Sequence, residues 1–261
     1  FIVKGSIEIR GIFLSKNLTC TFRSITRMIT ATLVYKYYRT FQALTDISFE
    51  IQKGEIVGFL GTNGAGKTTL MRILTTYLQA DSGQVEIAGY RLGRDDFKIR
   101  QKIGYLPETP PLYPGMSVKE YLKFAAQLKD VPPKRQNIQI DYVLGECSLM
   151  NVQDQSIATL SKGFKQRVGI AQSLIHDPEI LILDEPTNGL DPLQILQVRA
   201  LIKKLSGKHI VIVSSHILSE FEELAERLLI LQEGSIVLDG KLTQVLRTSQ
   251  QSLESVFLKL H

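Results

Sequence analysis

Residues 61–69 read GTNGAGKTT and stand between two segments of different periodicity. The apolar run at 56–60 is typical of a buried strand, and apolar residues at helical spacing over 70–78 indicate a helix. The glycines of the stretch allow a tight turn that brings backbone N–H groups close to a ligand. A helix that begins directly after such a turn adds positive potential, which favours phosphate. The sequence therefore predicts a strand, a phosphate-binding loop and a helix in succession.

The residues of this loop predict a nucleotide and a metal ion as its ligands. Lys67 would reach the β- and γ-phosphates, the hydroxyl of Thr68 would ligate Mg²⁺, and Thr69 would add a phosphate contact. The residues expected to bind the nucleotide here are Gly61, Thr62, Asn63, Gly64, Ala65, Gly66, Lys67, Thr68 and Thr69. The alternative is a glycine-rich turn with a lone surface lysine. We favour the P-loop interpretation, because all fixed positions of GxxxxGKT match and the flanking segments agree.

The composition indicates an ordinary globular chain. Of its 261 residues, 44% are apolar and 22% are charged, which is enough apolar material for a full core. No stretch approaches the roughly 18 uninterrupted apolar residues of a membrane span, so any membrane role would need a partner chain. Cys20 and Cys147 have neither metal-like spacing nor the pattern of a disulfide framework, which fits a reducing compartment.

Residues 1–27 differ in composition from the rest of the chain. They are rich in Ser, Thr and basic residues, poor in acidic ones, and without sustained periodicity. This segment is either upstream sequence outside the domain, which we favour, or a targeting or regulatory arm. It also carries part of the formal net charge of +5. A nucleic-acid footprint would need that charge clustered on a folded face, which sequence alone cannot show. No nucleic-acid partner is expected.

Residues 28–261 are expected to form an α/β domain. The predicted strands lie at 28–38, 43–52, 55–60, 85–87, 179–184 and 209–215. From about 98 to 178 the pattern is mostly helical and includes a capping box of Ser117 and Glu120. A hairpin and a C-terminal amphipathic helix end the chain. The expected fold is a P-loop NTPase core with a parallel sheet, an N-terminal antiparallel β layer and an inserted helical subdomain.

Two carboxylates follow the predicted strand at 179–184. Its apolar residues deliver Asp184 and Glu185 to the carboxyl end of the strand, where ligands bind in open α/β sheets. Asp184 is suited to hold Mg²⁺, directly or through water, and Glu185 is then free to act on an attacking water. Taken alone, the pair could equally be a strand end that runs into a turn.

Further motifs favour the functional interpretation of this pair. GTNGAGKTT, LSKGFKQR at 160–167, LILDEP, NGLDP and Ser215-His216 stand in the order and at the spacing of an ABC-transporter ATPase. The chain resembles that family over residues 28–261, and no other P-loop family has such a signature helix between its two nucleotide motifs. GYLPE, NGLDP and the C-terminal LESVFLKL resemble the ABC-2 type exporter branch.

The resemblance implies roles for individual residues. Two subunits would bind two ATP molecules between them, so that Ser161 and Gly163 of one subunit touch the γ-phosphate held by the P-loop of the other. Glu185 would be the general base or the carboxylate that orients water, and His216 would contact both the γ-phosphate and Glu185. Asp191 resembles the family residue that links the two ATP sites across the dimer, and its position before Pro192 also predicts a helix N-cap.

Some positions depart from the usual pattern of the family. Lys162 stands where many members have a second glycine in the signature. Glu108 occupies the position of the Q-loop glutamine, where a carboxylate can still ligate Mg²⁺ but adds negative charge beside the phosphates. Tyr38 is the aromatic residue expected to stack on adenine. The alternatives near it in sequence are Tyr35, Tyr37 and Phe41.

The function that the resemblance predicts is that of the ATP-hydrolysing subunit of an ABC transporter, an exporter of ABC-2 type. Its cofactors would be ATP and Mg²⁺, with Lys67 and the metal neutralising the phosphates during in-line attack by water. The expected partners are a second ATP-binding subunit, in a homodimer, and a transmembrane permease subunit that docks near 108–124. The chain would thus lie at the cytoplasmic face of a membrane.

The sequence bears on two alternatives to a transport function. A non-transport ABC ATPase acting on DNA or ribosomes usually carries a long coiled coil, but 70–160 has no sustained heptads. An inactive regulatory homologue is disfavoured because Lys67, Asp184, Glu185 and His216 occur together.

Overall fold

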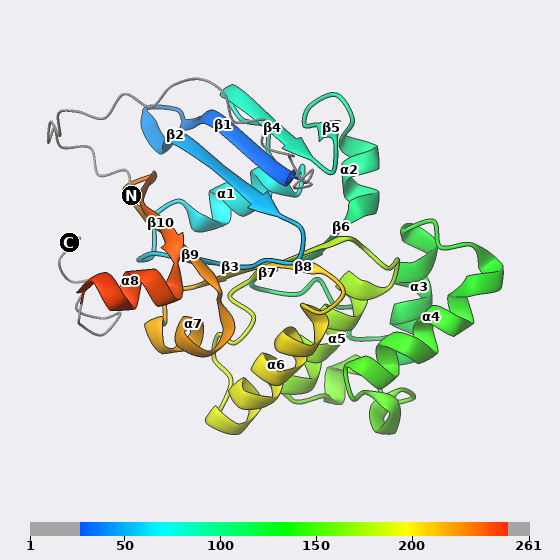
Figure 1. Ribbon diagram of the computed structural model, residues 1–261. Helices are drawn as coiled ribbons and strands as arrows, with labels where there is room; N and C mark the ends of the chain where they lie inside the picture. Colours follow the sequence, from blue (N-terminus) through cyan, green and yellow to red (C-terminus); the bar gives the residue numbers. More distant parts are fainter. Residues whose placement is uncertain (1–26, 250–261) are drawn as a thin grey trace, which may run out of the picture.

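The computed structural model describes residues 27–249, which form two sheets with helix α1 between them (Figure 1). The antiparallel sheet has the strand order β2-β1-β4-β5, and the second sheet has the order β10-β9-β3-β8-β7-β6. The strands are β1 (Arg27–Tyr38), β2 (Phe41–Gln52), β3 (Ile56–Leu60), β4 (Ser82–Ile87), β5 (Tyr90–Arg91), β6 (Ile103–Leu106), β7 (Ile180–Asp184), β8 (Ile210–Ser215), β9 (Arg227–Gln232) and β10 (Ser235–Lys241).

Most helices lie on one side of the second sheet, opposite the antiparallel sheet (Figure 1). The helices are α1 (Lys67–Leu74), α2 (Asp96–Lys102), α3 (Val118–Leu128), α4 (Pro133–Glu146), α5 (Lys162–Leu174), α6 (Pro192–Leu205), α7 (Leu218–Leu224) and α8 (Leu242–Ser249), with short 3₁₀ helices at Met150–Val152 and Ile157–Thr159. Between residues 27 and 249, no helix combines the length and apolar character needed to cross a bilayer.

The central strands β3, β7 and β8 of the second sheet are buried on both faces, which explains their continuous apolar runs. Successive side chains of β3 alternate between two cores. Ile56 and Leu60 pack among the helices, whereas Val57 and Phe59 pack against α1 and the antiparallel sheet. β7 alternates in the same way, with Leu181 on the helical side.

The parallel pairing of this sheet brings separate sequence motifs to one edge. β3 pairs with β8 and β9, and β7 pairs with β6 and β8, all in parallel. The carboxyl ends of β3, β7 and β8 therefore meet, and they are followed by Gly61, Glu185 and His216. This is the edge at which open α/β sheets bind ligands.

The fold class expected from the sequence is confirmed, including the antiparallel layer and the parallel strands. The capping box that begins α3 is also present, since Ser117 accepts from the backbone of Glu120 while the Glu120 side chain accepts from the backbone of Ser117. The predicted C-terminal helix and residues 1–26 of the N-terminal segment lie outside the described residues.

Two local features differ from the expectation. The helix after the P-loop ends at Leu74, earlier than predicted, because Thr76 adopts a left-handed φ of 64°. The block at 98–178 is also not helical throughout, because Ile103–Leu106 forms strand β6 beside β7. A Cβ on Gly104 of β6 would lie 2.1 Å from the carbonyl oxygen of Ser173, so this strand needs a glycine where α5 crosses it.

Candidate active site

The loop at 61–69 curls around the side chain of its own lysine. Gly64 and Gly66 have φ values of 84° and 102°, in the left-handed region that glycine adopts readily. The Lys67 ammonium donates hydrogen bonds to the carbonyl oxygens of Gly61, at 2.6 Å, and Thr62, at 3.1 Å. α1 begins at Lys67, so its free N–H groups and the ammonium act on the same space.

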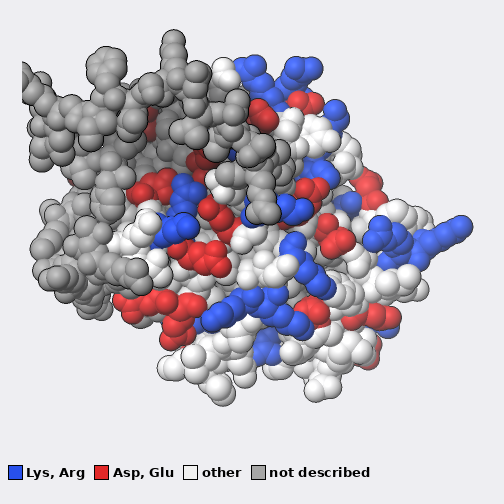
Figure 2. Space-filling view, viewed as in Figure 1, with Lys and Arg blue, Asp and Glu red and all other residues white. Residues whose placement is uncertain are grey.

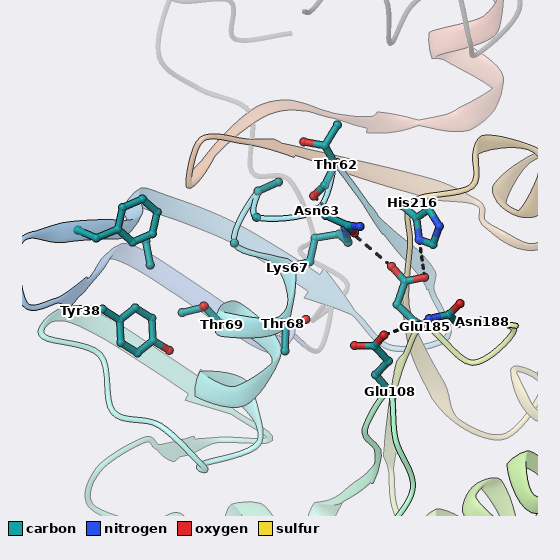
Figure 3. A pocket seen from close by; sticks show the side chains of 15 residues that line it. Tyr38, Thr62, Asn63, Lys67, Thr68, Thr69, Glu108, Glu185, Asn188 and His216 are labelled. Carbon is teal, nitrogen blue, oxygen red and sulfur yellow. Dashed lines mark hydrogen bonds and ion pairs between the residues drawn. The ribbon is translucent and has the colours of Figure 1, made fainter.

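Glu185 lies between a lysine and a histidine at the edge of the sheet (Figure 3). Its Oε1 is 3.9 Å from the Lys67 ammonium, and its Oε2 is 2.9 Å from Nδ1 of His216. Glu185 is buried and adopts a left-handed φ of 48°, so the end of β7 turns sharply there. Burial lowers the pKa of Lys67, and the charges of Glu185 and Asp184 oppose that shift.

The Asp184 carboxylate, at the end of β7, is fixed by the hydroxyl of Ser214 on the neighbouring strand β8. Its Oδ1 accepts a 2.6 Å hydrogen bond from Ser214, whose oxygen also accepts from the backbone N–H of Glu185 at 2.9 Å. Burial raises the pKa of Asp184, and the hydrogen bond from Ser214 opposes this. Its Oδ2 is buried and has no hydrogen-bond partner within 27–249, while the Thr68 hydroxyl lies near the carboxylate. Such oxygen groups are the ligands that Mg²⁺ prefers.

A pocket of about 280 Å³ opens between these groups and the antiparallel sheet. It is lined by Tyr38, Phe41, Ala43, Thr62, Asn63, Gly64, Ala65, Gly66, Lys67, Thr68, Thr69, Glu108, Glu185, Asn188 and His216. Most of the predicted site residues are therefore brought together. Of the four aromatic candidates for adenine, Tyr38 and Phe41 line the pocket and Tyr35 and Tyr37 do not.

Five predicted site residues do not line the pocket. Gly61 and Asp184 lie next to lining residues in the chain, whereas Ser161, Gly163 and Asp191 belong to the starts of α5 and α6. Ser161 caps α5, because its hydroxyl accepts from the backbone of Phe164 at 3.4 Å, and Asp191 caps α6 through the backbone of Gln194 at 2.9 Å. A Cβ on Gly163 would lie 2.6 Å from the side chain of Gln194, so the starts of α5 and α6 are in close contact. Ser161 and Asp191 are exposed and Gly163 is buried beside Gln194, and none of the three lines the pocket.

Sequence reasoning missed two residues that complete the site. Asn188 donates a 3.0 Å hydrogen bond to Glu108, which ties the segment after β6 to the segment after β7. Ser214 supports both Asp184 and Glu185. Asn188 belongs to the motif NGLDP, and Ser214 directly precedes the motif Ser215-His216. The role of Ser214 follows from its position opposite Asp184 in the pairing of β7 with β8, and this register is known only from the structure.

A glycine-rich loop before a helix, with an Asp-Glu pair and a histidine at the same sheet edge, defines a P-loop nucleoside triphosphatase. The chain belongs to the ABC transporter family, because residues 44–188 match the sequence profile described as "ABC transporter".

Individual relatives agree with this family. The ABC transporter ATP-binding protein YhcH of Bacillus subtilis is 42% identical over 207 residues, which cover 78% of this chain and 67% of YhcH. The bacitracin transport ATP-binding protein BcrA of Bacillus licheniformis is 36% identical, over 87% of this chain and 74% of BcrA. The ATP-binding cassette MJ0796, solved as a dimer in a post-hydrolysis state with ADP and Pi, is 26% identical with a TM-score of 0.75, over 82% of this chain and 99% of MJ0796.

The chain is thus an ATP-binding subunit of an ABC transporter and an ATPase, as the sequence motifs predicted.

Proposed function

We propose that this chain hydrolyses ATP at a site completed by a second copy of itself, and that hydrolysis powers export through a separate transmembrane subunit. The observation that carries the proposal is the contact of Glu185 with both Lys67 and His216 in one pocket. Ser161 and Gly163 lie outside that pocket, which supports their use at the site of a partner.

The nucleotide would lie along the pocket from the aromatic side chains to the sheet edge. Tyr38 and Phe41 are exposed at one end, where either ring can stack on adenine. The loop at 61–69 and the start of α1 would receive the phosphates through backbone N–H groups. Lys67 would move from its carbonyl acceptors onto the phosphate oxygens, which are stronger acceptors because they are charged.

Mg²⁺ fits the oxygen groups at the base of this pocket. Thr68, Asp184 and Glu108 would hold it, and the unpartnered Oδ2 of Asp184 supports this assignment. When bound, the metal would neutralise charge on the phosphates. Because Glu108 stands in place of a glutamine, the site has one more negative charge than the usual family pattern.

Glu185 would orient the attacking water. Its carboxylate lies within reach of both the loop and His216, so a water bound to it would face the terminal phosphate of a nucleotide held by the loop. His216 would fix the rotamer of Glu185 and contact the γ-phosphate. Both side chains come from the ends of adjacent parallel strands, which are rigid supports.

A second subunit would close the site with the start of α5. Ser161 and Gly163 present a small hydroxyl residue and a glycine at the N-terminus of a 13-residue helix, which suits an anion. Asp191 begins α6 beside them and would link the two sites. The solved dimer of MJ0796 with ADP and Pi supports a two-subunit assembly.

The substitution Glu185→Gln tests this site. It retains the shape of the side chain but removes the charge that acts on water, so ATP should remain bound and hold two copies together. Gel filtration with ATP should show a dimer for this variant. The same change at the exposed Glu86 is the matched control. A monomer with undiminished ATPase activity would overturn the role of Glu185.

The membrane partner would dock in a groove beside the segment 108–124. The groove measures about 470 Å³ and is lined by Tyr77, Tyr105, Pro111, Tyr113, Tyr121, Phe124 and Leu128, among others. Tyr77 is 76% exposed and Leu128 is 66% exposed, and exposed apolar side chains that gather in one groove mark an interaction site. A transmembrane subunit that covers this groove would keep the chain at the cytoplasmic face of the membrane.

Co-purification tests the partner. From detergent-solubilised membranes the native chain should recover a protein with several membrane spans, and Tyr77→Glu should weaken that recovery. Ile138→Glu is the matched control, because Ile138 is 67% exposed but does not line the groove. Recovery of ribosomes or DNA in place of a membrane protein would overturn the transport proposal.

A further inference from the structure

A small basic pocket lies where α3 ends and α4 begins, away from the ATP site. It measures about 170 Å³ and is lined by Gln101, Lys129, Asp130, Val131, Pro132, Arg135, Gln139 and His176. None of these residues lines the ATP pocket. Figure 2 shows basic side chains gathered at the edge of the molecule formed by the α3–α4 connection.

Lys129 supplies a positive charge that the described chain does not neutralise. The side chain is largely buried, and within residues 27–249 its ammonium makes no ion pair or hydrogen bond. Burial lowers the pKa of Lys129, and the nearby charge of Arg100 lowers it further. A buried charge is costly unless it is paired, so a counter-ion from outside the chain would be favourable here.

Gln139 adds an amide that has no hydrogen-bond partner among the described residues. It is only 8% exposed, it lines the pocket, and no hydrogen bond joins its side chain to any other described residue. Arg135 lines the same pocket from the first turn of α4, a helix whose N-cap, Pro132, supplies no side-chain hydrogen bond. The Lys129 ammonium, the Arg135 guanidinium and the Gln139 amide therefore offer several unused donors at one place.

His176 adds one acceptor to these donors. Its Nε2 lies 3.1 Å from the carbonyl oxygen of Ile103 and therefore carries the ring hydrogen. Burial lowers the pKa of His176 to about 4, so the ring is neutral and Nδ1 retains a lone pair. Nδ1 is buried without a partner among the described residues. A phosphate group that keeps one proton can donate to such a nitrogen while its other oxygens accept.

We propose that this pocket binds a phosphate group, either as inorganic phosphate or as a phosphomonoester. Lys129, Arg135 and the amide of Gln139 donate to its oxygens, and Nδ1 of His176 accepts its proton. Asp130 is the single carboxylate in the lining and is exposed, so the two basic side chains leave the pocket positive. The site is separate from ATP binding and does not depend on the proposed transport function.

Calorimetry with the P-loop filled by Mg²⁺ and a non-hydrolysable ATP analogue tests the pocket, because phosphate cannot then bind at the ATP site. Inorganic phosphate and glycerol 3-phosphate are the probes, and the native chain should bind one or both with one site per chain. Lys129→Met should weaken binding about tenfold or more, since a charge-assisted hydrogen bond is lost. Lys123→Met, on the exposed face of α3, is the matched control and should bind as the native chain does.

Gln139→Leu is a second variant that tests the amide without changing charge, and it should also weaken binding. The two sources of phosphate are separated by flotation with phosphatidylcholine vesicles, with and without phosphatidic acid. If only the vesicles with phosphatidic acid recruit the native chain, and Lys129→Met loses this recruitment, the ligand is a lipid headgroup. If the soluble probes bind but the vesicles do not recruit the chain, the ligand is a free phosphate. No binding of any probe, or binding that both variants leave unchanged, would overturn the proposal.

Discussion

Nδ1 of His216 lies 2.9 Å from Oε2 of Glu185, although the two residues are 31 positions apart in the chain. They come together because β7 and β8 are parallel neighbours, so each delivers the residue after its last position to the same sheet edge. Glu185 also has a left-handed φ, which turns its side chain at the strand end. The hydrogen bond therefore depends on strand order and on one unusual backbone conformation.

We predict that His216→Ala will reduce the rate of ATP hydrolysis roughly 100-fold, the scale typical of groups that take part in proton transfer. The change leaves Glu185 without its hydrogen-bond partner, so the carboxylate can rotate away from the water. ATP binding should change little, because the P-loop is intact. Steady-state kinetics and binding of a fluorescent ATP analogue measure the two effects. Native turnover in this variant would exclude a role for the contact.

Mixing two inactive variants tests whether the site is shared between subunits. Lys67→Ala removes the phosphate contact, and Ser161→Arg places a bulky cation at the start of α5. Each variant alone should be inactive. In a mixed dimer one site carries both changes and the other carries neither, so statistical pairing should restore about one quarter of the native rate. If the mixture stays inactive, the partner does not complete the site.

The chemistry of the site could be read from the sequence because it depends on residue type at close spacing. Gly64, Gly66 and Lys67 act within one loop, and the apolar run before Asp184 is enough to indicate a strand end. Local rules also identified the cap at Ser117, since both partners lie within one helical turn. These features required no knowledge of strand order.

The parts that could not be predicted depend on contacts between distant segments. Asn188 and Glu108 are 80 positions apart, and Ser214 reaches Asp184 across 30 positions through the register of β7 and β8. Strand β6 was missed because its four residues are too few to show a period. Its assignment as a strand comes from pairing with β7, a tertiary contact.

The raised pKa of Asp184 predicts that this carboxylate destabilises the free subunit at neutral pH. Burial favours the protonated form of Asp184 in the folded chain. The stability that this protonated carboxyl contributes is fully present below the pKa of Asp184 in the unfolded chain, and it is lost as the pH rises through the higher pKa of Asp184 in the folded chain. Asp184→Asn resembles the protonated side chain. At pH 7 it should therefore increase the free energy of unfolding and the Tm, and it should abolish ATPase activity.

The stability difference should disappear in acid, below about pH 4, where the native carboxyl is protonated in both states. Thermal unfolding over a pH series measures it. Ser214→Ala is the companion variant, because loss of its hydrogen bond should raise the pKa of Asp184 further. An Asn variant less stable than the native chain at pH 7 would contradict the argument.

Asp191 is proposed to have two roles that a pair of substitutions can separate. Its Oδ1 accepts from the backbone of Gln194 and so caps α6, and it is also expected to link the two ATP sites. Asp191→Ala should lose about 1 kcal/mol of stability with the cap. Asp191→Ser should keep the cap, because a serine hydroxyl accepts the same hydrogen bond, but it removes the carboxylate. If Asp191 links the sites, the Ser variant will match native stability in chemical denaturation and yet lose ATPase activity; if it only caps the helix, both properties will stay native.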